Sequence, residues 1–252
     1  MVTKTKTKTK KASPAAKTTK TKKTAVPEIK LEDLLAAGCH FGHSASRINP
    51  RMRDYVYATR DGIHIIDLVK TKEGLLAAIK FLSSLVSDGK KVIFVGTKRQ
   101  AQAEIEKYAR KIGFFYVKKR WVGGLLTNWQ EVKKNLDRLA EIEEELKKKN
   151  RGGRTKYEQV LLKRQYNRLM GIYGGLKGLE EPPAAILVVD VKRERAAISE
   201  ANKTGVKVVA IIDTNGDPSG VDYLIPANDD AQASIDYILG KIAAAIKGKA
   251  KK

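Results

Sequence analysis

Short apolar runs, each bounded by polar residues, organise most of this chain. In the clearest of them, Ala184–Val189, every position is apolar. A strand that is apolar on both faces is typical of a parallel sheet with helices packed on both sides. The strands expected on this basis cover residues 91–95, 114–117, 184–189, 206–212 and 222–226.

Between these runs, apolar residues recur at helical intervals. In residues 71–86 they include Leu75, Ile79 and Leu82, which lie on one face of a helix with 3.6 residues per turn. Other helices are expected over 100–112, through 196–201, from 229 to 246, and from Leu31 to an end at Gly38. Helices that alternate with buried strands predict an α/β fold with a parallel sheet.

A β-hairpin is expected before this alternation begins. Tyr55-Val-Tyr-Ala and Ile63-His-Ile-Ile-Asp flank the dipeptide Asp61-Gly62. Asp-Gly favours the tight turn that joins two antiparallel strands. We therefore predict one strand on each side of this dipeptide.

Residues 129–181 interrupt the α/β pattern because they contain no strand signal and many charges. Two series of apolar residues flank Asn150-Arg-Gly-Gly-Arg, a sequence that breaks helices. We predict an antiparallel coiled-coil helical hairpin, inserted into an α/β domain of residues 28–128 and 182–246. Its seam is expected to place Leu139, Ile142 and Leu146 against Leu162, Leu169 and Tyr173. The hairpin is either a structural spur packed on the domain or a protruding docking arm, and its basic turn favours the arm.

The charge of the chain is strongly positive and is concentrated at the two ends. Of 252 residues, 50 are Lys or Arg and 28 are Asp or Glu, which gives a net charge of +22. Residues 1–27 contain nine Lys and no acid, and alternating Thr and Lys cannot bury an apolar face. We therefore predict a disordered Lys/Thr-rich arm there and a basic tail over 247–252. A field of this sign favours nucleic acid or an anionic membrane surface.

Several classes of protein are excluded by composition. Cys39 is the single cysteine, so no internal disulfide can form. The longest wholly apolar run has six residues, and the first residues contain no apolar stretch. We therefore expect neither a secreted scaffold, nor a disulfide-stabilised miniprotein, nor an integral membrane protein.

Signals for a nucleotide or calcium site are weak. The chain has no glycine-rich phosphate-binding motif, so Lys98 and Arg99 are expected to be exposed cations without a built cradle for phosphate. The segment 213–220 begins like a calcium loop, but Pro218 stands where such a loop has Gly. A polar turn with capping side chains is the better interpretation of this segment.

The histidines and the cysteine offer little chemistry. His40 and His43 are three residues apart, and Asp190 or Asp213 could add a ligand if the fold brought them close. Hydrogen-bonded histidines in a packed loop are favoured over a metal site. Cys39 is expected to be a small buried residue. We predict no catalytic residue, no cofactor and no metal, and whether His40 and His43 bind a metal stays open.

Basic residues near aromatic residues and glycines give the strongest local signal. Residues 117–129 contain three cations, two tryptophans and a Gly-Gly pair. Such a loop can approach a sugar-phosphate chain while Arg120 and Trp121 contact phosphate or stack. Alternatively, Trp121 and Trp129 anchor the loop in the core. The residues predicted to contact RNA are Arg47, Arg51, Arg53, Lys98, Arg99, Lys118, Lys119, Arg120, Trp121, Asn128, Lys149, Arg151 and Arg154.

Six ordered segments resemble a known family, the bacterial small ribosomal subunit protein two family. They are Gly38-Cys-His-Phe-Gly-His-Ser with Asn49-Pro50-Arg-Met, Gly62-Ile-His-Ile-Ile-Asp-Leu, Phe94-Val-Gly-Thr-Lys-Arg, Arg120-Trp-Val-Gly-Gly-Leu-Leu-Thr-Asn, Asp213-Thr-Asn-Gly-Asp-Pro and Ile225-Pro-Ala-Asn-Asp-Asp. The resemblance covers about residues 31 to 240. The chain differs from the family in its long Lys/Thr arm, in its basic rather than acidic tail, and at Cys39 and Ala227.

The resemblance implies a flavodoxin-like α/β fold with a protruding helical hairpin and no catalysis. It also implies a cytoplasmic place in the small ribosomal subunit, with small-subunit rRNA and neighbouring ribosomal proteins as partners, ribosomal protein one among them. No membrane and no small-molecule substrate are expected. Two alternative functions are an α/β enzyme acting on a phosphosugar or nucleotide and a membrane-surface protein. The first lacks a phosphate loop, and the second lacks an amphipathic helix that is both basic and apolar.

Overall fold

The computed structural model describes residues 28–147 and 155–247. The predicted arm, the turn of the hairpin with Lys149, Arg151 and Arg154, and residues 248–252 of the tail lie outside the described residues. The elements before the central sheet are α1 (Leu31–Ala36), β1 (Phe41–Ser44), η1 (Ala45–Arg47), η2 (Pro50–Tyr55), β2 (Val56–Arg60) and β3 (Ile63–Ile66). The remainder are α2 (Leu68–Ser87), β4 (Val92–Val95), α3 (Arg99–Ile112), β5 (Phe115–Val117), α4 (Trp129–Lys147), α5 (Lys156–Tyr173), η3 (Gly174–Leu176), β6 (Ala185–Val189), α6 (Arg195–Thr204), β7 (Lys207–Ile212), β8 (Tyr223–Pro226) and α7 (Gln232–Lys247).

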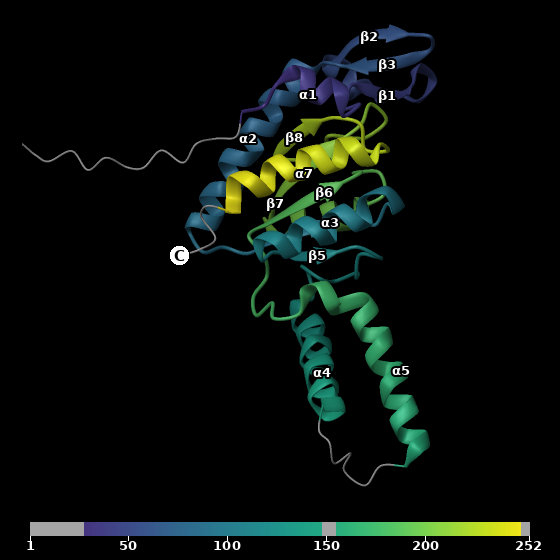
Figure 1. Cartoon of the computed structure of the whole chain (residues 1–252), viewed down its shortest axis with the longest axis vertical. Coiled ribbons are helices and arrows are strands. Elements are labelled where there is room, and N and C mark those ends of the chain that lie inside the picture. The colour runs from purple at the N-terminus through teal and green to yellow at the C-terminus, as the bar shows by residue number, and fades with distance from the viewer. Residues whose placement is uncertain (1–27, 148–154, 248–252) are drawn as a thin grey trace, which may run out of the picture.

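A parallel five-stranded sheet forms the centre of the fold, as predicted (Figure 1). Its spatial order is β5-β4-β6-β7-β8, which is the flavodoxin-like order, with the first strand of the sheet between the second and the third. Each strand begins within one residue of its predicted start. The register places Val92 beside Ala185, so β4 pairs with a strand from beyond the inserted helices.

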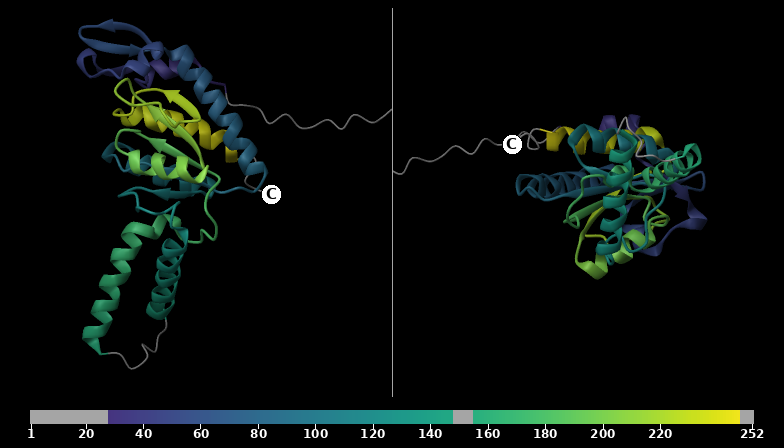
Figure 2. Two further views of the ribbon diagram at one scale, coloured as in Figure 1. Left: turned by 180° about the vertical axis from the view of Figure 1, so that it is seen from behind. Right: turned by 90° about the horizontal axis from the view of Figure 1, so that it is seen from below.

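Alternate residues of each strand enter two separate cores. On one face, Phe94 and Leu187 pack with residues of α2, α3 and α7. On the other face, Ile93 and Val188 pack with α6, with the loop after β5 and with the base of the inserted helices. Figure 1 shows α3 and α7 in front of the sheet, and the reverse view in Figure 2 shows α6 covering the other side. Burial on both faces explains why the strands read as continuous apolar runs.

Local side-chain hydrogen bonds shift two helix starts from their predicted positions. The carboxylate of Asp67 accepts a hydrogen bond from the Val69 N–H at 2.9 Å, so α2 begins three residues early. The Asn228 side chain accepts from the Asp230 and Ala231 N–H groups at 2.8 and 3.1 Å, which forms a turn and delays the start of α7.

A separate three-stranded antiparallel sheet has the order β1-β3-β2. The predicted hairpin is present, with Asp61 and Gly62 both at positive φ in its turn. Strand β1 was not predicted, because Phe41-Gly-His-Ser contains few apolar residues. A Cβ on Gly42 would lie 2.7 Å from the Thr214 methyl group, so glycine allows β1 to approach the loop after β7.

The inserted segment forms two helices that extend away from the sheet (Figures 1 and 2). Near the sheet, Leu139 and Ile142 of α4 are buried, and so are Leu169 and Tyr173 of α5. Farther out, Leu146 is exposed, contrary to its predicted place in the seam. The two helices draw apart in that direction, so α4 and α5 do not pack as a continuous coiled coil over residues 129–147 and 156–173.

Candidate nucleic-acid interface

A carboxylate from α6 fixes the basic loop that follows β5. Glu200 Oε1 accepts hydrogen bonds from Trp121 Nε1 at 3.1 Å and from the Gly124 N–H at 2.8 Å, and Oε2 accepts from the Leu126 N–H at 3.1 Å. Burial opposes ionisation, but these donors hold the pKa of Glu200 below its usual range. An ionised Glu200 thus sets the path of the loop over residues 121–126.

The two interpretations of Trp121 are distinguished by its burial. The indole is 7% exposed and packs in the core with Leu125 and Leu126. It has no open face on which a base could stack, so the structure favours an anchor rather than a stacking platform. Trp129 is partly buried against the same core.

The loop presents cations beside this anchor. Lys119 and Arg120 are exposed, and neither has an ion pair or a side-chain hydrogen bond within the described part of the chain. Asn128 is also exposed, at the start of α4. Lys118 differs, because it is half-buried and pairs with Glu106. Lys119, Arg120 and Asn128 are therefore the accessible members of the predicted loop site.

The carboxyl ends of β4 and β6 meet where a flavodoxin-like sheet usually binds its ligand. Here Glu194, which is 2% exposed, occupies that position. Its Oε1 accepts from the Thr97 N–H at 2.9 Å and from the Thr97 hydroxyl at 2.5 Å, and Arg193 donates to that hydroxyl at 2.9 Å. A carboxylate from the chain itself stands where a phosphate would bind, so these residues provide no phosphate cradle.

Lys98 is not the exposed cation that the sequence predicted. Its Nζ lies 2.6 Å from carboxylate oxygens of Asp229 and Asp230 and 3.5 Å from Asp190, and its side chain is 11% exposed. Burial disfavours its charge, yet these aspartates raise the pKa of Lys98. Burial and the charge of Asp190 raise the pKa of Asp229 to about 7. Three carboxylates already surround Lys98, whereas Arg99 is exposed at the first position of α3.

The second basic cluster lies around η1 and η2. Arg47, Arg51 and Arg53 are all exposed. Arg51 Nη1 lies 3.1 Å from Asp217, and Asn49 accepts a hydrogen bond from the Arg51 N–H at 3.0 Å. Arg47 and Arg53 make no such contacts in the described residues. Asp217 is thus engaged with an arginine, which supports the polar-turn interpretation of 213–220.

His43 lies between two carboxylates. Its Nδ1 is 2.9 Å from Asp213 and its Nε2 is 3.1 Å from Asp230. The hydrogen bond with Asp213 raises the pKa of His43 against the opposing effect of burial. Of the two aspartates considered from sequence, Asp213 is therefore the partner, and Asp190 lies near Lys98 instead. In the described residues, one ligand atom each from His43, Asp213 and Asp230 lie within 4.8 Å of one another and could hold a metal ion.

The other candidates for chemistry occupy structural positions. Cys39 is fully buried, Ser234 Oγ lies 3.2 Å from its Sγ, and burial raises the pKa of the thiol. A buried thiol with a raised pKa is a poor nucleophile, as expected. His40 lies against the ring of Phe41, and His64 shares a hydrogen bond with Thr59 at 2.8 Å.

Sequence reasoning missed the acidic residues that organise these positions. Glu200 and Glu194 act on segments more than seventy residues earlier in the chain. Nothing in the sequence near either residue indicates its partner, because each contact forms only when α6 packs on the sheet. The one available signal was the position of Glu194 immediately before a predicted helix.

Among the described helices, none has the length and apolar character needed to cross a membrane.

Comparison with known proteins agrees with this architecture. The sequence model of the family described as "Ribosomal protein S2" matches residues 34–248. A "Small ribosomal subunit protein uS2" of Picosynechococcus sp. is 44% identical over 221 residues, covering 88% of this chain and 86% of the relative. Proteins of the same name from Chloroflexus aurantiacus and Roseiflexus sp. are 44% and 46% identical, covering 87% and 88% of this chain and 93% and 85% of the relatives. With this extent of similarity along nearly the whole described structure, the chain belongs to the ribosomal protein S2 family.

Proposed function

We propose that this chain is a structural, non-enzymatic component of the small ribosomal subunit in the bacterial cytoplasm, and that it binds small-subunit rRNA. The names of its relatives support the place in the small subunit. The presence of Glu194 at the usual ligand position of the sheet supports the absence of catalysis. The net charge of +22 supports a polyanionic partner.

The observation that carries rRNA binding is the exposure of Lys119 and Arg120 on a fixed loop. The Glu200 contacts hold Trp121, Gly124 and Leu126, so the two cations lie between strand β5 and this held segment. A cationic side chain on a well-ordered backbone loses less conformational freedom when it binds a phosphate than a cationic side chain on a flexible segment does. Lys119 also lines a hollow of about 390 Å³, together with Asn167 of α5 and with Arg110 and Lys118, which both pair with Glu106 in the same lining.

A paired variant tests this interface. Lys119→Ala with Arg120→Ala should reduce incorporation into small subunits in competition with the wild-type chain. The thermal midpoint should stay nearly unchanged, because both side chains are exposed. Lys80→Ala with Lys90→Ala removes the same charge from exposed residues of α2 and the turn after it, and serves as the control. Equal incorporation of the two double variants would refute a specific role for the loop.

The inserted helices and the tails extend the proposed interface. Their basic turn, including Lys149, Arg151 and Arg154, is proposed to contact rRNA or a neighbouring protein, and the family resemblance suggests ribosomal protein one as a neighbour. The helices project from the sheet (Figure 1), and exposed apolar residues such as Leu146 and Val160 lie along them. A projecting element that leaves apolar side chains uncovered suits a docking role.

A further inference from the structure

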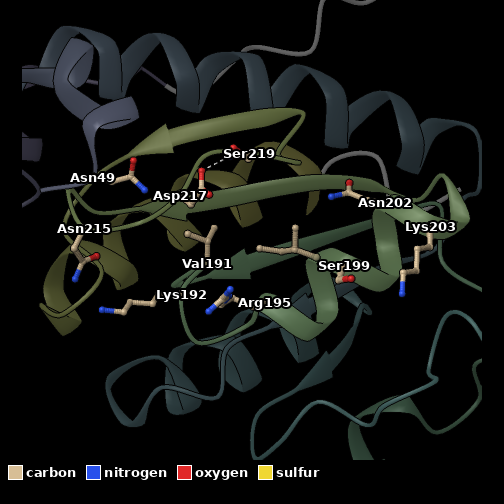
Figure 3. A pocket seen from close by; sticks show the side chains of 11 residues that line it. Asn49, Val191, Lys192, Arg195, Ser199, Asn202, Lys203, Asn215, Asp217 and Ser219 are labelled. Carbon is tan, nitrogen blue, oxygen red and sulfur yellow. Dashed lines mark hydrogen bonds between the residues drawn. The ribbon is translucent and has the colours of Figure 1, made fainter.

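An open hollow of about 670 Å³ lies at the carboxyl ends of β6 and β7, beside α6. It is separate from the basic loop and from the position that Glu194 fills. Its floor is formed by Val191 and Ile198, which are 3% and 7% exposed. Figure 3 shows polar side chains arranged around this apolar floor. The volume falls within the usual range for sites that bind small organic groups.

The rim of the hollow carries uncompensated positive charge. Lys192, Arg195 and Lys203 line it and are exposed. None of the three side chains has an ion pair or a hydrogen bond within residues 28–147 and 155–247. The one carboxylate in the lining belongs to Asp217. Arg51 pairs with it at 3.1 Å, so the hollow is complementary to an anion.

The amide side chains in the lining have unused hydrogen-bonding capacity. Asn202 and Asn215 make no side-chain hydrogen bond to the described residues. Asn49 uses its oxygen for the Arg51 N–H and keeps its NH₂ group free. Gly220 lies against Asn202, because a Cβ there would come within 2.1 Å of Asn202 Nδ2. The Asn202 amide thus lies beside Gly220, and an amide offers a donor and an acceptor that match the edge of a base.

We propose that this hollow binds one unpaired nucleotide of RNA, with the edge of its base toward the Asn202 amide and its phosphate near Lys192 and Arg195. The inference rests on the proposed function, because it names the form of RNA that one further surface accepts. A base can enter a hollow of this kind only when it is unstacked and splayed out, as in loops and bulges of RNA. Figure 3 shows Lys192 and Arg195 along one side of the floor and Asn202 and Lys203 at the other end. A base and its phosphate can therefore be contacted at the same time.

The first test uses the full chain and transcribed small-subunit rRNA. Lys192→Ala with Arg195→Ala should raise Kd about ten- to a hundredfold, since two charge-assisted contacts are lost. The control pair Lys80→Ala with Lys90→Ala removes equal charge and should change Kd by less than about threefold. Asn202→Leu, which keeps the charge and approximate size, should raise Kd about five- to fiftyfold. Equal losses in the two double variants, or no effect of Asn202→Leu, would overturn the proposal.

The second test identifies the occupant. A photo-cross-linking residue at Ser199, an exposed lining position, should join to a single unpaired rRNA nucleotide in assembled subunits. Cross-linking to a protein segment would overturn the proposal, and so would cross-links scattered over many nucleotides. Saturable binding of free nucleoside monophosphates that Asn202→Leu abolishes, without a change in rRNA affinity, would also overturn it. If the Lys192→Ala, Arg195→Ala double variant and Asn202→Leu bind rRNA normally, only the proposal for this hollow is refuted. If the wild-type chain does not bind rRNA, the proposed function itself is refuted.

Discussion

Replacing Glu200 tests whether one carboxylate organises the candidate interface. Glu200→Ala removes the acceptor for three N–H donors, those of Trp121, Gly124 and Leu126. Each intramolecular hydrogen bond contributes about 1 kcal/mol net, and a buried donor left without an acceptor adds to that cost. We therefore expect the free energy of unfolding to fall by about 3 kcal/mol.

The conservative variant separates the individual contacts. Glu200→Gln retains an oxygen that can accept from Trp121 and Gly124, but its NH₂ group would face the Leu126 N–H in place of Oε2. One contact is lost and two donors oppose each other, so the expected loss is about 1–2 kcal/mol. A graded loss, with Ala above Gln, would show that the hydrogen bonds and not only the packing of the side chain stabilise the loop.

Urea unfolding followed by tryptophan fluorescence measures this effect, because Trp121 is buried beside the substituted residue. Glu181→Ala is the matched control, because this glutamate is exposed and its side chain makes no ion pair or hydrogen bond to the described residues. The sign of the pH dependence follows from the lowered pKa of Glu200. Its stabilisation is present above the ordinary glutamate value of about 4.3 and is lost as pH falls through the folded value. A Glu200→Ala variant within about 0.5 kcal/mol of the control would refute the reasoning.

Four further predictions concern other parts of the molecule. Deleting residues 1–24 should make the slope of log affinity against log salt shallower in rRNA binding, because nine Lys are removed; an unchanged slope would show that the arm makes no contact with RNA. Replacing residues 145–160 by a short Gly-Ser turn should preserve a cooperative melt but lower occupancy in purified subunits under competition, and normal occupancy would remove the docking role. His43→Asn should lower the free energy of unfolding more at pH 6 than at pH 9, because a histidine pKa raised by Asp213 stabilises fully below about 6.5 and loses that effect as pH rises through the folded value; equal losses at both pH values would contradict the ion pairs. Gly175→Ala should destabilise by about 2–3 kcal/mol in chemical unfolding, because its Cβ would lie 2.1 Å from the Tyr116 carbonyl oxygen, and Gly123→Ala, which meets open space, should have little effect by comparison.

The sheet could be predicted from sequence because its strands are buried on both faces. Segments such as 184–189 admit almost only apolar residues, so each run coincides with a strand to within one residue. Strand β1 gave no such signal, since Phe41–Ser44 forms a strand through pairing with β3 rather than through its own composition. The start of α7 was predicted three residues early because the Asn228 turn competes with the helix.

The candidate site was less predictable because the accessibility of a cation depends on distant residues. Lys98 and Arg120 each stand beside another basic residue in the sequence. Three aspartates surround Lys98, two of them from the segment after β8, whereas Arg120 is exposed. The same reasoning applies to Trp121, whose partner Glu200 lies on α6. Local patterns thus located the charged segments but not the contacts that decide which charges are available.

The pairing of β4 with β6 has a consequence for the folding of this chain during its own synthesis. Strand β4 lies between β5 and β6, and Val92 cannot meet Ala185 until the inserted helices have been synthesised. About 70 residues separate the end of β5 from the start of β6, which takes roughly 4–14 s at ordinary rates of elongation. During that interval one edge of β4 is unpaired, because β6 has not yet been synthesised. An unpaired strand edge can form hydrogen bonds with strands of other chains. The inserted hairpin therefore sets a delay in co-translational folding, and slowing elongation within residues 129–181 should increase aggregation of the nascent chain more than slowing it after residue 212.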